Sequence, residues 1–135
     1  MPGGQCLCGG VKYEIDGNTS QLWLCHCSMC RRSSGSAFHA VTICRSSRFR
    51  WVCGEDRIHS HCTPSGYETR FCGSCGSPLP QVREDAGQVI LLAGALDASF
   101  DRPIARHIFV GSKAPWYAIN DDAPQFEEHA PGRED

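Results

Sequence analysis

Seven of the ten cysteines of this chain stand in three short clusters whose spacing is typical of thiolate ligands to a metal ion. The clusters are Cys6 and Cys8, then Cys25, Cys27 and Cys30, then Cys72 and Cys75. A short turn between two cysteines points both sulfurs toward one ion. Two pairs supply four ligands, which make a closed structural site, while three ligands leave one coordination position open for chemistry.

The first and last clusters predict a closed zinc site made by Cys6, Cys8, Cys72 and Cys75. Glycines follow or separate the cysteines of each pair, and glycine suits the tight turns that aim backbone N–H groups at sulfur. These ligands come from distant parts of the chain, so one ion would cross-link them. Its binding free energy, on the order of 10 kcal/mol at neutral pH, would then be folding free energy.

The middle cluster predicts an open site. Cys25 and Cys27 are two residues apart, so on a strand their sulfurs leave the same face. Cys30 follows from the next turn, and the positive charges of Arg31 and Arg32 favour its thiolate form. Three thiolates make a bound zinc ion electron-rich, so the site suits a substrate thiol better than a metal-bound hydroxide.

Other readings of the cysteines stay open at this point. A histidine from His39, His59, His61 or His107 could complete the middle site as a second structural zinc. His26 points to the opposite face if its segment is extended. A disulfide scaffold would require an oxidising compartment. The other three cysteines, which are Cys44, Cys53 and Cys62, have no partner at short spacing, so we expect them to be small buried apolar residues.

The rest of the sequence predicts an all-β fold with very little helix. Short segments rich in β-branched and aromatic residues recur with turn signals between them. We expect strands at residues 11–15, 21–24, 37–43, 49–53, 57–62, 67–71, 88–92 and 106–110. The Thr63–Gly66 segment is typical of a hairpin turn. Helical turns are expected at residues 28–32, with Ser28 as the N-cap, and at residues 97–101.

Composition limits the classes of partner. The chain has 135 residues, a net charge of −2 and a pI near 6.3, which argues against a nucleic-acid surface. No apolar run is long enough to span a bilayer, and residues 1–4 do not resemble a secretion signal. We therefore expect a cytoplasmic protein with one domain over residues 1–122 and an acidic, loosely ordered tail over residues 123–135. Edge strands make a homodimer plausible.

Several ordered motifs resemble the glutathione-dependent formaldehyde-activating enzyme family, which also includes centromere-protein-V-like proteins. They are Gly4-Gln5-Cys6-Leu7-Cys8-Gly9-Gly10-Val11, Cys25-His26-Cys27-Ser28-Met29-Cys30-Arg31-Arg32-Ser33-Ser34-Gly35, Arg70-Phe71-Cys72-Gly73-Ser74-Cys75-Gly76, Gly94-Ala95-Leu96-Asp97 and His107-Ile108-Phe109-Val110 with Trp116. The resemblance covers nearly the whole chain, from Gly4 to about Trp116.

The resemblance implies a tent of β-sheets pinned by zinc and related to zinc-bearing methionine sulfoxide reductases. It implies a structural zinc at Cys6, Cys8, Cys72 and Cys75. It also implies a second, catalytic zinc at Cys25, Cys27 and Cys30, beside which glutathione binds. The implied reaction joins glutathione to formaldehyde, a carbon–sulfur lyase running in reverse.

Arg31, Arg32 and His107 are candidate contacts to the thiol substrate. Arg70 is a further candidate for a substrate carboxylate, although a solvated or structural role fits each of the three arginines better. Two other functions compete with the lyase. A zinc-stabilised binding module without enzymatic activity predicts two closed zinc sites. A methionine sulfoxide reductase needs a nucleophilic cysteine late in the chain, yet no cysteine follows Cys75.

Overall fold

The structure is a computed structural model that describes residues 3–97 and 99–131. The chain divides into two compact units. The first unit contains Met1–Ser20 and Thr42–Arg102, and the second contains Gln21–Val41 and Pro103–Asp135. Strands dominate both units and the described residues form one α-helix, which confirms the all-β prediction. No described helix has the length and apolar character that a membrane crossing needs.

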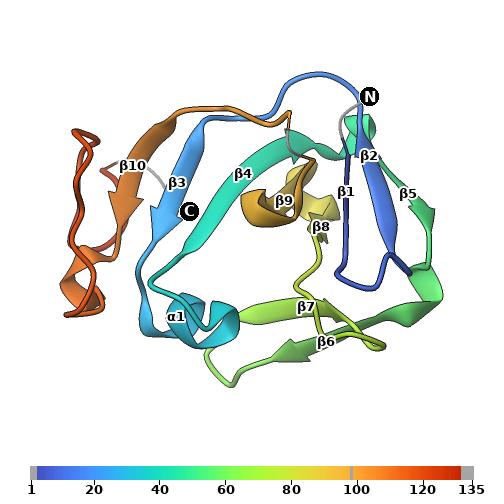
Figure 1. Ribbon diagram of the computed structural model, residues 1–135, viewed down its shortest axis with the longest axis horizontal. Helices are drawn as coiled ribbons and strands as arrows, with labels where there is room; N and C mark the ends of the chain where they lie inside the picture. Colours follow the sequence, from blue (N-terminus) through green and yellow to red (C-terminus); the bar gives the residue numbers. More distant parts are fainter. Residues whose placement is uncertain (1–2, 98, 132–135) are drawn as a thin grey trace. The chain divides into compact units, whose positions relative to one another are not determined.

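The first unit is built from short antiparallel strands (Figure 1). Its strands are β1 (Gly3–Gln5), β2 (Lys12–Ile15), β5 (Phe49–Cys53), β6 (Ile58–Cys62), β7 (Glu68–Cys72), β8 (Gln81–Arg83) and β9 (Gln88–Leu92), with the C-terminal part of β4 (His39–Arg45). The strands β1, β2 and β5 form one sheet, while β6 pairs with β7 and β8 pairs with β9. The predicted hairpin is confirmed, since Gly66 donates to the Thr63 carbonyl at 2.9 Å.

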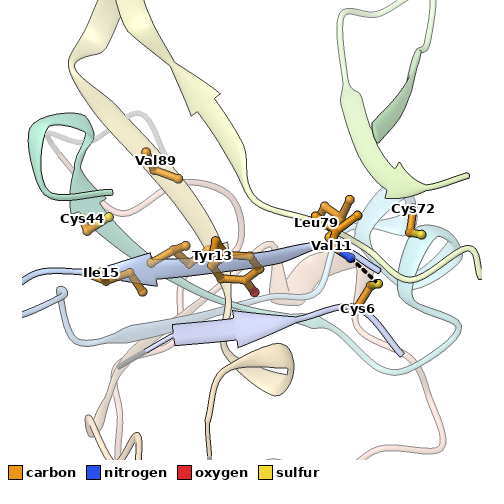
Figure 2. Close-up of a cluster of buried hydrophobic side chains, with 9 residues drawn as sticks. Cys6, Val11, Tyr13, Ile15, Cys44, Cys72, Leu79 and Val89 are labelled. Carbon is orange, nitrogen blue, oxygen red and sulfur yellow. Dashed lines mark hydrogen bonds between the residues drawn. The ribbon is translucent and has the colours of Figure 1, made fainter. Parts of the chain in front are cut away.

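An apolar cluster lies in the first unit and includes members of the outer cysteine pairs (Figure 2). Alternation along β2 buries Tyr13 and Ile15 and leaves Glu14 partly exposed, as expected for a half-buried strand. The rings of Phe49 and Trp51 pack on Tyr13, with centroids 5.7 and 5.9 Å away. Three cysteines belong to this cluster, and two of them, Cys6 and Cys72, come from the outer cysteine pairs, while the third is Cys44. The core therefore fixes one member of each outer cysteine pair.

The second unit contains two adjacent parallel strands and the helix. These elements are β3 (Leu22–Cys25), β10 (Ile104–Ile108) and α1 (Ser28–Ser34). β10 pairs in parallel with β3, and β3 pairs antiparallel with the N-terminal part of β4 (Figure 1). Trp23 of β3 is buried. The ladder places the end of β10, at His107 and Ile108, beside Leu24 and Cys25.

Residues 124–128 run along β10. Backbone hydrogen bonds join His107 N–H to the Pro124 carbonyl at 2.8 Å and Phe126 N–H to the His107 carbonyl at 3.0 Å. The domain boundary at residue 122 stays a prediction, and residues 132–135 lie outside the described part. In the predicted turn at residues 97–101, Phe100 N–H donates to the Asp97 carbonyl at 3.0 Å, while Ala98 lies outside the described residues.

Candidate metal centres

The outer cysteine pairs meet in the first unit. The sulfurs of Cys6, Cys8, Cys72 and Cys75 all lie within 4.8 Å of one another. Cys8 Sγ is 3.6 Å from Cys6 Sγ and 3.9 Å from Cys72 Sγ. A tetrahedral zinc ion with Zn–S bonds of about 2.3 Å requires sulfurs about 3.8 Å apart. The four side chains therefore fit a closed zinc site in both number and spacing.

Backbone amides support this cluster. Val11 N–H lies 3.3 Å from Cys6 Sγ, Gly10 N–H lies 3.4 Å from Cys8 Sγ, and Ser74 N–H lies 3.4 Å from Cys72 Sγ. Such donors stabilise negative charge on sulfur. A hydrogen bond with the Ser77 hydroxyl also lowers the pKa of Cys75, to about 5. These hydrogen bonds thus favour the thiolate form of Cys75, which is the form that a metal ion binds.

Three glycines meet different requirements of these turns. Gly9 and Gly76 have φ angles of 74° and 78°, in the left-handed region where other residues are strained. Gly73 has no such angle, but a Cβ there would collide with the ring of His59. The glycines predicted for the turns are therefore needed, two for conformation and one for space.

The middle cluster lies where β3 ends and α1 begins, in the second unit. The sulfurs of Cys25, Cys27 and Cys30 lie within 4.8 Å of one another, and all three residues are buried. Cys27 is the N-cap, because its Sγ accepts the Cys30 N–H at 3.2 Å. The expectation that Ser28 caps this helix is wrong, since the sulfur one residue earlier takes that acceptor role.

In the middle cluster, hydrogen bonds favour the negatively charged thiolate form of one cysteine, Cys27. Hydrogen bonds from the Cys25 and Cys30 thiols lower the pKa of Cys27 far below its ordinary value. The same hydrogen bond to Cys27 raises the pKa of Cys25. Among the residues that the structure describes, no histidine nitrogen or carboxylate joins these three sulfurs within the 4.8 Å limit. The arrangement therefore offers a metal ion three cysteine sulfurs and leaves its fourth position open.

The candidate histidines do not close this site. His39 lies opposite Cys25 in the β3–β4 ladder, and its Nε2 is 2.8 Å from the Ser33 hydroxyl. His59 and His61 belong to β6 in the first unit, where His59 stacks on Phe71. They form no metal-binding group of three within the described ranges.

Sequence reasoning missed a chain of polar side chains that begins at the buried His26 and ends at the exposed Asp121. His26 Nε2 lies 2.8 Å from His107 Nδ1, and His107 Nε2 lies 2.9 and 3.0 Å from the two carboxylate oxygens of Asp121. Burial lowers the pKa of His26 to about 4, and the hydrogen bond from His107 lowers the pKa of Asp121. The available signal was the position of His26 between two predicted ligands; nothing in the sequence singled out Asp121.

The proposed substrate contacts lie in different settings. Arg31 Nε donates to the Ser112 carbonyl at 3.1 Å, whereas Arg32 is exposed on α1. His107 is fully buried with both ring nitrogens engaged, so its contact with a substrate stays a prediction. Arg70 is 3.4 Å from Glu68 within β7. Trp116, from the end of the resembling region, is 71% exposed.

The remaining cysteines differ from expectation. Cys44 is buried, as predicted, and its burial raises the pKa of the thiol to about 11. Cys53 and Cys62 are exposed, so the prediction of burial is wrong for both. They end the short strands β5 and β6, whose last residues do not face the apolar cluster.

Comparison with known proteins finds a matching family, a related sequence and a related structure. The model of the family described as glutathione-dependent formaldehyde-activating enzyme matches residues 1–112. A Halomonas elongata protein, named provisionally as such an enzyme, is 27% identical over 128 residues, which cover 86% of this chain and 79% of that protein. A crystal structure of a Rhodobacter sphaeroides protein matches with a TM-score of 0.57 and 25% identity, over 77% of this chain and 99% of that chain. The chain therefore belongs to the glutathione-dependent formaldehyde-activating enzyme family.

Proposed function

We propose that this protein is a zinc-dependent carbon–sulfur lyase that forms or cleaves an adduct between a glutathione-like thiol and a formaldehyde-like aldehyde. One observation carries the proposal: three buried sulfurs converge, and no fourth ligand joins them among the described residues. Family membership supplies the substrate class. The proposed fourth ligand is the substrate's own sulfur.

The two cysteine clusters have separate roles in this proposal. Cys6, Cys8, Cys72 and Cys75 would hold a structural zinc ion. Cys25, Cys27 and Cys30 would hold a second ion and act as the catalytic residues. When bound, this second zinc ion supplies a position that keeps a substrate thiol in its thiolate form at neutral pH.

The reaction needs no oxidant or reductant. The substrate sulfur attacks the carbonyl carbon of the aldehyde, and a carbon–sulfur bond forms. The electron pair of the carbonyl π bond moves to oxygen, which takes up one proton to become a hydroxyl group. The proton of the thiol is released to solvent, so thiol and aldehyde together give one S-hydroxymethyl thioether.

The two arginines of α1 would recognise the substrate's carboxylates. Both lie in the last turn of the helix that carries Cys30. A guanidinium group pairs well with a carboxylate, and glutathione carries two carboxylates. Arg32 is the better candidate because it is exposed, while Arg31 already donates to Ser112.

The test is exchange NMR on zinc-loaded protein with glutathione and formaldehyde. We expect adduct formation faster than the uncatalysed reaction, and a loss of about 100-fold or more in Cys27→Ser. The matched control is Cys53→Ser, which changes an exposed thiol outside both clusters. An uncatalysed rate for zinc-loaded wild-type protein would overturn the formaldehyde reaction.

Other features of the proposal stay predictions. They are a cytoplasmic location and a homodimer.

The rival function is a binding module without enzymatic activity. Such a module would retain its biological role in Cys27→Ser as long as the variant folds.

A further inference from the structure

With both imidazoles neutral, the chain from the buried His26 to Asp121 has one consistent set of proton positions. A carboxylate only accepts hydrogen bonds, so His107 donates to Asp121 through Nε2–H. A neutral imidazole has one donor and one acceptor, so His107 Nδ1 accepts a hydrogen bond from His26 Nε2–H. His26 Nδ1 is then a lone pair, and this buried atom has no partner. Asp121 thus dictates the tautomer of both histidines.

This chain holds the residue between two of the three cysteines of the open site. His26 N–H donates to the Ile108 carbonyl at 3.0 Å, and the His26 side chain binds the neighbouring residue of β10, His107. Residue 26 is therefore attached to one strand through both its backbone and its side chain. Both histidines are 0% exposed.

Aromatic rings prevent the His26 side chain from turning. The ring of Phe38 lies edge-on with its centroid 5.3 Å away, and the ring of Tyr117 lies 6.1 Å away. These two rings also contact each other, at 5.4 Å. Packing and hydrogen bonds together hold His26 in one orientation, and this constrains the flanking Cys25 and Cys27.

We propose that His107 and Asp121 are positioning residues that act through His26 to hold Cys25 and Cys27 in the arrangement that binds a metal ion. Asp121 is far from the cysteines in sequence and its side chain is 35% exposed, yet it sets the direction of the whole chain. The inference rests on the proposed function in one respect only, that the middle cluster binds a metal ion.

The test variant is Asp121→Asn, in the zinc-loaded full chain. Asp121 Oδ1 also accepts the Ala123 N–H at 3.0 Å, so an asparagine that keeps this hydrogen bond turns its NH2 group toward His107 Nε2. Donation from that NH2 group reverses the chain and places an N–H at His26 Nδ1. A buried N–H without an acceptor is tolerated less well than an unpaired acceptor. We expect about a tenfold loss of zinc affinity at the middle cluster, measured by competition with a chelator.

The four-cysteine cluster made by Cys6, Cys8, Cys72 and Cys75 is an internal control, since its zinc affinity should not change in Asp121→Asn. Asp122→Asn is the matched variant, because this neighbouring carboxylate is exposed and outside the chain. Imidazole ¹⁵N NMR gives a second readout. We expect both histidines to carry their protons on Nε2 in the wild-type protein and on Nδ1 in Asp121→Asn. Asp121→Glu, which restores the carboxylate, should recover the wild-type tautomers.

Three results would overturn the inference: unchanged zinc affinity at the middle cluster in Asp121→Asn, equal losses at both clusters, or a wild-type protein that binds only one zinc ion. The lyase proposal fails on separate grounds. The tautomers and the zinc affinity could change as expected while zinc-loaded wild-type protein does not accelerate adduct formation. That result would support the positioning role of His107 and Asp121 and contradict the formaldehyde reaction.

Discussion

The two groups of cysteines that meet in the structure use similar side chains in opposite ways. The first cluster is now Cys6, Cys8, Cys72 and Cys75, and the second is Cys25, Cys27 and Cys30. The first gathers four sulfurs from two distant segments, and its members range from the buried Cys72 to the exposed Cys8. The second gathers three buried sulfurs from one short segment. Backbone amides donate to sulfur in both clusters, and the second has in addition a side-chain network of two histidines and an aspartate behind it.

The difference shows how a protein can separate stability from reactivity with one type of ligand. A four-sulfur cluster saturates a tetrahedral ion and leaves no position for a substrate. A three-sulfur cluster leaves one position, and its local origin means that its loss opens no long loop. We therefore expect the first cluster to govern folding and the second to govern chemistry.

The largest expected effect is on stability, and it contrasts Cys72→Ser with Cys30→Ser. If the four-cysteine cluster holds the proposed zinc ion, loss of that site removes a contribution on the order of 10 kcal/mol, comparable to the whole stability of a small domain. Cys72→Ser should therefore unfold at least the first unit, while the Cys30→Ser variant should keep the β structure of the wild-type protein. Circular dichroism and zinc content measure both outcomes. Equal stability of the two variants would break the contrast between the clusters.

Stepwise removal of metal should show the same contrast with a smaller effect. If about 10 kcal/mol of binding free energy is shared equally among four thiolates, one ligand fewer lowers the affinity by about two orders of magnitude. A chelator titration followed by circular dichroism and free zinc should release the first equivalent of metal without unfolding. Simultaneous loss of both equivalents and of structure would contradict the assignment.

The smallest effect concerns substrate recognition beside the second cluster. Arg32→Gln should raise KM for glutathione by up to about fivefold, the range of an exposed ion pair, and leave kcat unchanged. Arg83→Gln is the matched control, because Arg83 is exposed at the end of β8 in the first unit. Steady-state kinetics separates the two parameters. A change in kcat alone would place Arg32 outside substrate binding.

Much of the fold could be predicted from local patterns. The strands β5 and β9 have the bounds expected from their aromatic and β-branched residues. The strands β1 and β8 were missed because three residues carry almost no periodic signal. β10 begins two residues earlier than expected, at Ile104, where its pairing with β3 begins.

The cysteine grouping could also be predicted, because spacing alone restricts which sulfurs can share an ion. The polar chain could not, since the contact between His26 and His107 joins residues 81 positions apart. Exposure of Cys53 was equally hidden, because burial depends on which face of a strand meets the core. The spacing of the cysteines therefore predicts the candidate ligands, whereas the residues that hold these ligands in place can be identified only from the tertiary structure.

The separation of the first cluster along the chain also has a consequence for how the protein refolds. Cys8 and Cys72 are 64 positions apart, whereas Cys27 and Cys30 are separated by three. The entropic cost of closing a loop rises with the logarithm of its length, so the second cluster can assemble early and the first must wait for a long-range encounter. A zinc ion already held by one outer pair would capture the other pair on contact. Refolding speed should therefore depend on zinc concentration through the first cluster alone.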